Sequence, residues 1–150
     1  MPGLTGIDPE LVYVTGVAHR LALSLATLVV DQTLPSESDV PFEPFTAVFP
    51  VDQRLTANSF REALGFESNR TVDLAPASRF FERVAATAVE SGDQRARQVF
   101  ATLELVMRRA LGTLRQAFVR GEEVVEVPFF LFGRLGGGPL VGLRSLAIET

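Results

Sequence analysis

Glu37 and Asp39 are the residues of this sequence whose types and spacing could most readily do chemistry. They lie two positions apart in the run 36–39, which reads SESD and which we call the acidic loop, and Glu43 follows nearby. Paired carboxylates can act as general acid and base, and their hard oxygens also suit a metal ion such as Mg²⁺. A solvated surface is the alternative interpretation of such a cluster, because most acidic residues are exposed.

Few other side chains offer reactivity. His19 is the single histidine, and because triads and metal sites usually need more than one such partner, we interpret it as structural or exposed. The absence of cysteine excludes disulfides, thiolate metal sites and cysteine catalysis, and the absence of lysine excludes Schiff-base chemistry. We therefore expect no catalytic residue, no cofactor and no metal site of the chain's own.

Two further patterns receive structural interpretations. Arg97, Arg108 and Arg115 fall on one face of a predicted helix, but Glu104 shares that face, so we expect a solvated surface and no nucleic-acid contact. The run 133–139, GRLGGGP, has the glycines of a phosphate-binding loop without its GK[ST] ending. A turn between two strands is the better interpretation of that run.

The composition describes one apolar, weakly acidic domain. The 150 residues are 47% hydrophobic with a net charge of −4, which predicts a single domain over 1–150 and gives no electrostatic attraction to nucleic acid. The first residues lack the basic region of a secretory signal, and the apolar run 17–30 is too short to span a membrane. Together with the lack of cysteine, this predicts a cytoplasmic protein that does not enter membranes.

Hydrophobic periodicity and turn residues predict the elements that must position the acidic residues. Apolar residues at helical spacing, with Pro, Thr and Gly at the ends, predict helices over 9–31, 56–65, from 76 to a break at 91–92, and over 93–118, the last one ended by Gly121. Strands are predicted over 45–49, 70–74, 123–132 and 140–148. This order is not a regular βαβ alternation, so we expect an α+β fold with helices on a mainly antiparallel or mixed sheet of about four strands.

Three blocks of the sequence resemble the nuclease A inhibitor family. The run 36–45, SESDVPFEPF, is similar to the family's SES-[DE]-x-PFE-x-F, and residues 72–73 with 79–83 are similar to its VD…FF-x-R. The third block follows the family's spacing without a gap up to the last residue, at Gly133, Leu140, Gly142, Glu149 and Thr150.

The resemblance implies both a fold and a function. The fold is a three-layer α-β-α sandwich, and the protein is a proteinaceous inhibitor that binds a non-specific DNA/RNA endonuclease of the ββα-metal type and blocks its active site. In the family, the glutamate of the SES motif and the final threonine contact the nuclease's metal; at the matching positions these are Glu37 and Thr150. Glu37, Asp39 and Glu43 would imitate the charges of a nucleic-acid backbone, and Glu149 would belong to the same contact surface.

The chain departs from the family pattern between the middle and long helices. There the family carries an acidic segment with an exposed tryptophan, whereas residues 88–93 read AVESGD and the chain has no tryptophan. Because aromatic anchors often dominate an interface, this departure bears on which nuclease the chain binds. Two other functions stay open: a domain that kept the fold but binds another protein or itself, and an enzyme that uses Glu37 and Asp39.

Overall fold

The structure, a computed structural model, describes residues 9–35, 40–123 and 125–149, with side-chain surroundings from residue 14 onward. The acidic loop and Thr150 lie outside the described residues. Along the rest of the chain, four helices and five strands follow one another: α1 (Pro9–Leu28), β1 (Glu43–Ala47), α2 (Ala57–Ala63), β2 (Thr71–Pro76), α3 (Ser78–Ser91), α4 (Gln94–Leu111), β3 (Arg115–Arg120), β4 (Glu126–Arg134) and β5 (Leu140–Ile148).

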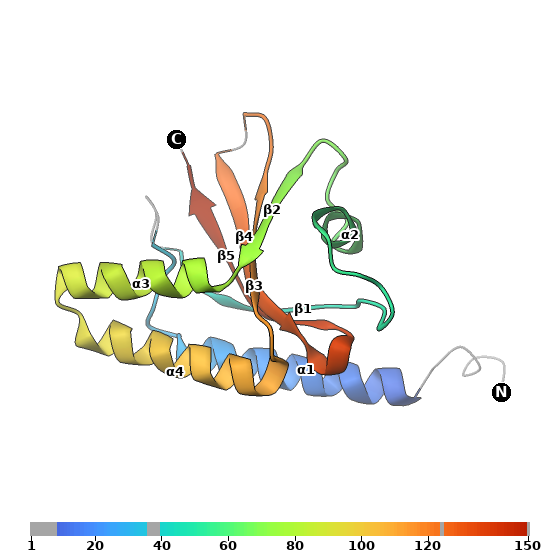
Figure 1. Cartoon of the computed structure of the whole chain (residues 1–150), viewed down its shortest axis with the longest axis horizontal. Coiled ribbons are helices and arrows are strands. Elements are labelled where there is room, and N and C mark those ends of the chain that lie inside the picture. Colours follow the sequence, from blue (N-terminus) through green and yellow to red (C-terminus); the bar gives the residue numbers. More distant parts are fainter. Residues whose placement is uncertain (1–8, 36–39, 124, 150) are drawn as a thin grey trace.

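The five strands form one antiparallel sheet in the order β1-β5-β4-β3-β2 (Figure 1). The α+β class is therefore confirmed, while the expected number of about four strands is one too few. The expected hairpin turn is confirmed as well, because residues Leu135–Gly137 form a short 3₁₀ turn that joins β4 to β5.

The missing strand lies where the sequence predicts the end of a long helix. α4 ends at Leu111, because Gly112 adopts a left-handed φ of 74° and its N–H returns to the carbonyl of Arg108. Residues Arg115–Arg120 then pair with both β2 and β4. The prediction of a helix over 93–118 ended by Gly121 is thus wrong in its last turns, and with it the shared helical face of Arg97, Arg108 and Arg115.

The helix predicted to begin at Pro76, α3, begins instead at Ser78, because Pro76 is the last residue of β2. Several other helix boundaries follow their local signals. Thr56 and Ser59 form a reciprocal capping box at the start of α2, with the Ser59 N–H donating to Thr56 Oγ1 at 3.0 Å and the Thr56 N–H to Ser59 Oγ at 2.8 Å. Gly92, at φ 68°, ends α3, and the Asp93 carboxylate caps α4 by accepting from the Ala96 N–H. Within the described part of the chain, no helix combines the length and apolar character needed to cross a membrane.

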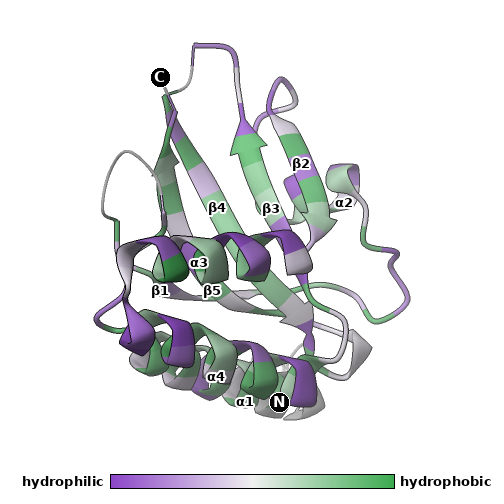
Figure 2. Ribbon diagram, turned by 60° about the vertical axis from the view of Figure 1, so that its left-hand side comes forward, coloured by the Kyte–Doolittle hydropathy of each residue, from purple (hydrophilic) through white to green (hydrophobic). Residues whose placement is uncertain are grey.

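The helices are divided unequally between the two faces of the sheet (Figures 1 and 2). α1, α3 and α4 cover one face, which we call the three-helix face, where Phe129 and Leu131 of β4 enter a large apolar core. α2 covers the opposite face, the α2 face, where the alternate residues Phe130 and Phe132 pack around the fully buried Phe60. Because β4 is buried on both faces, it reads as a continuous apolar run.

Two glycines of the third sequence block are required by packing. A Cβ on Gly142 would overlap the carbonyl oxygen of Leu131, and a Cβ on Gly133 would lie 2.7 Å from the Leu111 Cβ. Both positions therefore need glycine for close approach of backbone and helix. Packing therefore accounts for these two residues of the block, whereas Glu149 is exposed and has no such packing role.

Candidate functional site

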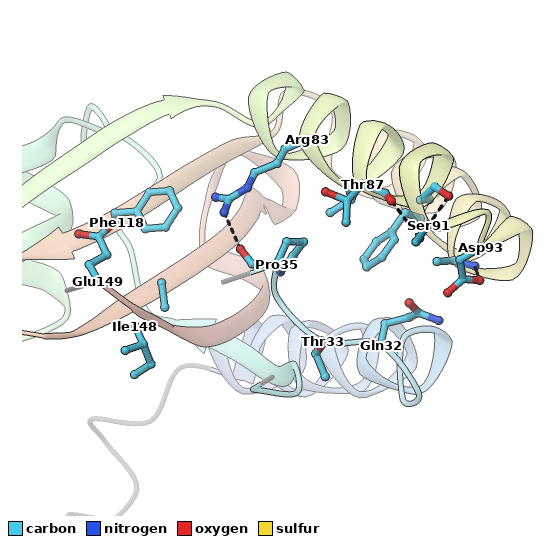
Figure 3. Close-up of a pocket in the computed structure, with 15 residues that line it drawn as sticks. Gln32, Thr33, Pro35, Arg83, Thr87, Ser91, Asp93, Phe118, Ile148 and Glu149 are labelled. Atoms are coloured by element: carbon cyan, nitrogen blue, oxygen red, sulfur yellow. Dashed lines mark hydrogen bonds between the residues drawn. The ribbon is translucent and has the colours of Figure 1, made fainter. Parts of the chain in front are cut away.

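A pocket of about 590 Å³ opens on the three-helix face, next to Pro35, the residue that precedes the acidic loop (Figure 3). Its walls come from α3, from the beginning of α4, from residues leading into the acidic loop, and from the end of β5. The floor is buried and apolar, formed by Val84, Ala88, Ala96 and Phe100. Pro35 and Glu149 both line this pocket, so the segments that precede Glu37 and Thr150 meet around one concavity.

The base of the acidic loop is held on both sides. The Leu34 N–H donates to the Val40 carbonyl at 3.0 Å, which closes the loop, and Ser145 Oγ on β5 donates to the same carbonyl at 3.1 Å. Arg83 on α3 donates from Nη2 to the Pro35 carbonyl at 2.6 Å, a bond visible in Figure 3. Glu37 and Asp39 thus belong to a short segment whose two ends are tied to α3 and β5.

Glu149, predicted as a contact residue, is held by an arginine that the sequence did not single out. Arg120, the last residue of β3, donates from Nε and Nη2 to the two carboxylate oxygens of Glu149 at 3.1 and 2.8 Å. Its Nη1 donates to Asp73 Oδ2 on β2 at 2.9 Å, and its guanidinium lies 4.7 Å from the centre of the Phe118 ring. A planar guanidinium with these partners has little orientational freedom.

The ion pair keeps both groups charged. The two hydrogen bonds from Arg120 lower the pKa of the Glu149 carboxyl, partial burial opposes this, and the positive charges of Arg120 and Arg83 lower it further. The same bonds to Glu149 raise the pKa of Arg120, with a smaller contribution from the charge of Asp73. Glu149 therefore presents an ionised carboxylate at the rim of the pocket.

Glu43 lies away from this pocket. It begins β1 on the α2 face, opposite Arg144 of β5 in the strand register, and accepts a 3.3 Å bond from the Nε of Arg144. Glu149, by contrast, lines the pocket on the three-helix face. Among the predicted contact residues that the structure describes, only Glu149 lies at the pocket.

The second sequence block contributes directly to this site. Asp73, the aspartate of the VD pair, accepts a hydrogen bond from Arg120, which in turn holds Glu149. Arg83, the arginine of FF-x-R, donates to the carbonyl of Pro35, which precedes the acidic loop. Arg120 itself escaped sequence reasoning because it lay beyond the predicted end of the long helix. The aromatic and β-branched residues Phe118 and Val119, shortly before Gly121, were the strand signal that could have found it.

No group of three or more His, Cys, Asp or Glu within 9–35, 40–123 and 125–149 is placed to hold a metal ion. His19 is exposed on α1, and Arg108 is engaged by Glu104 at 2.9 Å on the surface of α4, as expected for a solvated face. The fold and the pocket define a small α+β domain in which Pro35 and Glu149, which both line one pocket, are each held by an arginine.

The comparison with known families identifies the class. The model of the nuclease A inhibitor-like protein family matches residues 19–150, which is most of the chain. The chain therefore belongs to the nuclease A inhibitor-like family. Members of this family are inhibitors and not enzymes, in agreement with the interpretation of the sequence. A search of curated proteins found no match.

Proposed function

We propose that this protein inhibits a non-specific DNA/RNA endonuclease by covering the nuclease's active site with the acidic loop and with Glu149 and Thr150. The observation that carries the proposal is the shared pocket: Pro35, next to the acidic loop, and Glu149, next to Thr150, line the same concavity. Two segments that are distant in sequence are thereby available to one partner surface.

The chemistry follows from the oxygens of Glu37 and Thr150. Mg²⁺ in a nuclease prefers hard oxygen ligands and keeps positions open for a substrate phosphate. A carboxylate or hydroxyl oxygen can take such a position without offering a bond that the enzyme can cleave. Glu37 and Asp39 add negative charge of the sign that a nucleic-acid backbone carries, which draws a basic cleft toward the inhibitor.

A titration of nuclease activity tests the proposal. Purified protein is added to ββα-metal nucleases from the same source organism, and activity on DNA and RNA is measured at a fixed Mg²⁺ concentration. We expect activity to fall to its limit at one inhibitor per enzyme, and a large excess of Mg²⁺ to leave the inhibition unchanged because the metal is not removed. Full activity of every such nuclease at stoichiometric protein contradicts the proposal.

The matched variants are Glu37→Gln and Glu67→Gln. Both substitutions remove one carboxylate charge, but Glu67 is an exposed residue between α2 and β2, on the far side of the sheet from the pocket. We expect only Glu37→Gln to weaken inhibition. Equal effects of the two variants would show that general charge, and not the acidic loop, accounts for binding.

Self-association is the second candidate, favoured by the surface of α1. Leu23 and Leu28 are 45% and 37% exposed on this helix, whose first part precedes the family match. If the protein inhibits no nuclease, sedimentation of wild type and of Leu23→Gln decides this candidate. A dimer that the substitution dissociates supports it, and a monomer in both cases rejects it.

A further inference from the structure

We propose that Arg120 and Arg83 are positioning residues for inhibition: Arg120 orders the segment that leads to Thr150, and Arg83 orders the base of the acidic loop. The inference rests on the proposed function. It adds that the inhibitory surface depends on two arginines that act through other residues, because their guanidinium groups are engaged within the chain.

Arg120 acts where the sheet opens. The β2–β3 pairing continues to Thr71 and Arg120, and the β4–β5 pairing continues to Glu126 and Ile148. Between β3 and β4, however, the register stops at Phe118 and Phe129. The strands therefore separate at this end, as Figures 1 and 2 both show, and the Arg120–Glu149 pair bridges the opening.

Glu149 needs this bridge because the strand ladder has ended. After Ile148, one backbone hydrogen bond holds Glu149, from its N–H to the Val125 carbonyl at 2.9 Å. The two hydrogen bonds from Arg120 fix the side chain as well. Arg120 is itself restrained, since Arg70 donates to the carbonyls of Val119 and Arg120 at 2.9 and 3.3 Å.

Arg83 supports the other segment in a comparable way. Proline has no backbone N–H, so the carbonyl is the one backbone group of Pro35 that can form a hydrogen bond. The bond from Arg83 at 2.6 Å uses that group and adds the strength of a charged donor. Arg83 and Glu149 both line the pocket, and the charge of Arg83 lowers the pKa of Glu149. It thus lies between the two segments, as Figure 3 shows.

A purely structural role does not account for these arginines. Exposed ion pairs add little to folding stability, and the bonds from Arg83 to Pro35 and from Arg120 to Glu149 are both exposed. Substituting them should therefore leave the domain folded while it loosens one segment each. This separation of local order from global stability distinguishes positioning from stabilisation.

The experiment compares Arg120→Gln and Arg83→Gln with Arg108→Gln. Arg108 is a matched control, because its Nε and Nη2 donate to Glu104 at 3.0 and 2.9 Å on α4, outside the pocket lining. We expect the first two variants to weaken nuclease inhibition about tenfold to a hundredfold, as loss of a supporting contact typically does, and Arg108→Gln to leave it unchanged. Thermal midpoints of all three are expected to agree closely.

Amide hydrogen exchange, measured on the inhibitor alone, distinguishes positioning from stabilisation, because a positioning residue affects exchange in one segment only. Arg120→Gln is expected to speed exchange at 146–150 and Arg83→Gln at 34–40, each without affecting the other segment. Arg120→Lys should restore only part of the protection, because an ammonium cannot form the two parallel bonds. Asp73→Asn reaches Glu149 only through Arg120 and serves as a second variant, expected to show the same pattern more weakly.

The outcomes separate the two proposals. If the wild type inhibits a nuclease, and neither Arg120→Gln nor Arg83→Gln changes inhibition or exchange, the positioning roles are overturned. The proposed function is then unaffected. Faster exchange throughout the chain also overturns them, since it indicates global destabilisation. A wild type that inhibits no nuclease overturns the proposed function together with the inhibitory role of the arginines, and the exchange data still decide whether they order the two segments.

Discussion

Asp73 and Glu149 share one guanidinium, that of Arg120, although β3 and β4 separate their strands in the sheet. The network ties β2 to the end of β5 on the three-helix face. It replaces the backbone pairing that is absent between β3 and β4 at this end. A charged network used in this way should respond to pH and to salt, unlike the apolar packing beneath it.

The first prediction concerns acid. Because Arg120 lowers the pKa of Glu149, the ordering that the pair provides is fully present above the usual glutamate pKa of about 4.3 and is lost as pH falls through the lowered pKa of the folded protein. Protection from exchange at 146–150, measured relative to an unstructured amide at the same pH, should therefore fall on acidification before the domain unfolds. The measurement is an NMR titration of the Glu149 carboxyl.

In Arg120→Gln, the Glu149 pKa should move up toward its ordinary value, because the two hydrogen bonds that lower it are gone. Arg108→Gln is the control and should leave the Glu149 titration unchanged. A wild-type Glu149 that titrates at the ordinary glutamate value would show that the pair with Arg120 does not persist in solution.

The α4–β3 boundary shows where sequence patterns mislead. Leu111, Leu114 and Phe118 continue the helical spacing of the buried residues of α4, so periodicity predicts an unbroken helix. In the structure, Leu111 belongs to the helix, Leu114 to the connection and Phe118 to a strand, and all three reach the same core. Hydrophobic periodicity indicates which residues are buried but not whether a helix or a strand carries them. Here a helix and then a strand place consecutive apolar residues in the same core.

The site shows the same limit for polar contacts. Local signals, such as the Thr56 cap of α2 and the glycine break at Gly92, were recognisable because they involve neighbouring residues. The bonds from Arg83 to Pro35 and from Arg120 to Glu149 join residues far apart in the chain. Only the register of the strands and the placement of α3 determine such pairs, so the sequence alone could name Glu149 but not its partner.

The second prediction concerns glycine. Gly142→Ala should lower the free energy of unfolding by about 1–3 kcal/mol, because the added methyl overlaps the Leu131 carbonyl and forces β4 and β5 apart. Gly16→Ala, in α1 with nothing within 4 Å, should raise it by about 0.5–1 kcal/mol through helix propensity. Urea unfolding of both variants is the measurement. Effects of the same sign would contradict the packing described for β4 and β5.

The third prediction separates stability from inhibition. Phe60 is fully buried on the α2 face and stacks on Phe132 with ring centres 5.1 Å apart. Phe60→Ala should lower the free energy of unfolding by about 3–5 kcal/mol. The pocket lies on the other face, so the fraction that stays folded should inhibit as well as wild type. A loss of affinity per folded molecule, measured below the unfolding transition, would mean that the α2 face takes part in binding.

The fourth prediction concerns the oxygens of Thr150. Thr150→Val replaces the side-chain hydroxyl with a methyl group of similar size and so removes one oxygen from the proposed metal contact. We expect inhibition to weaken by about 1–3 kcal/mol, the usual range for losing a charge-assisted contact, with an unchanged thermal midpoint.

Glu37→Gln should have an effect of similar size, and because both residues are proposed to contact one metal ion, the double variant should lose less than the sum of the two. The measurement is the inhibition constant of each single variant and of the combination, at one ionic strength so that long-range attraction is constant. Full additivity would indicate that the two residues act at separate points of the nuclease. Unchanged inhibition in both single variants would show that neither Glu37 nor Thr150 contributes to binding. The hydrogen bonds from Arg120 to Glu149 would then have no role in inhibition through Thr150.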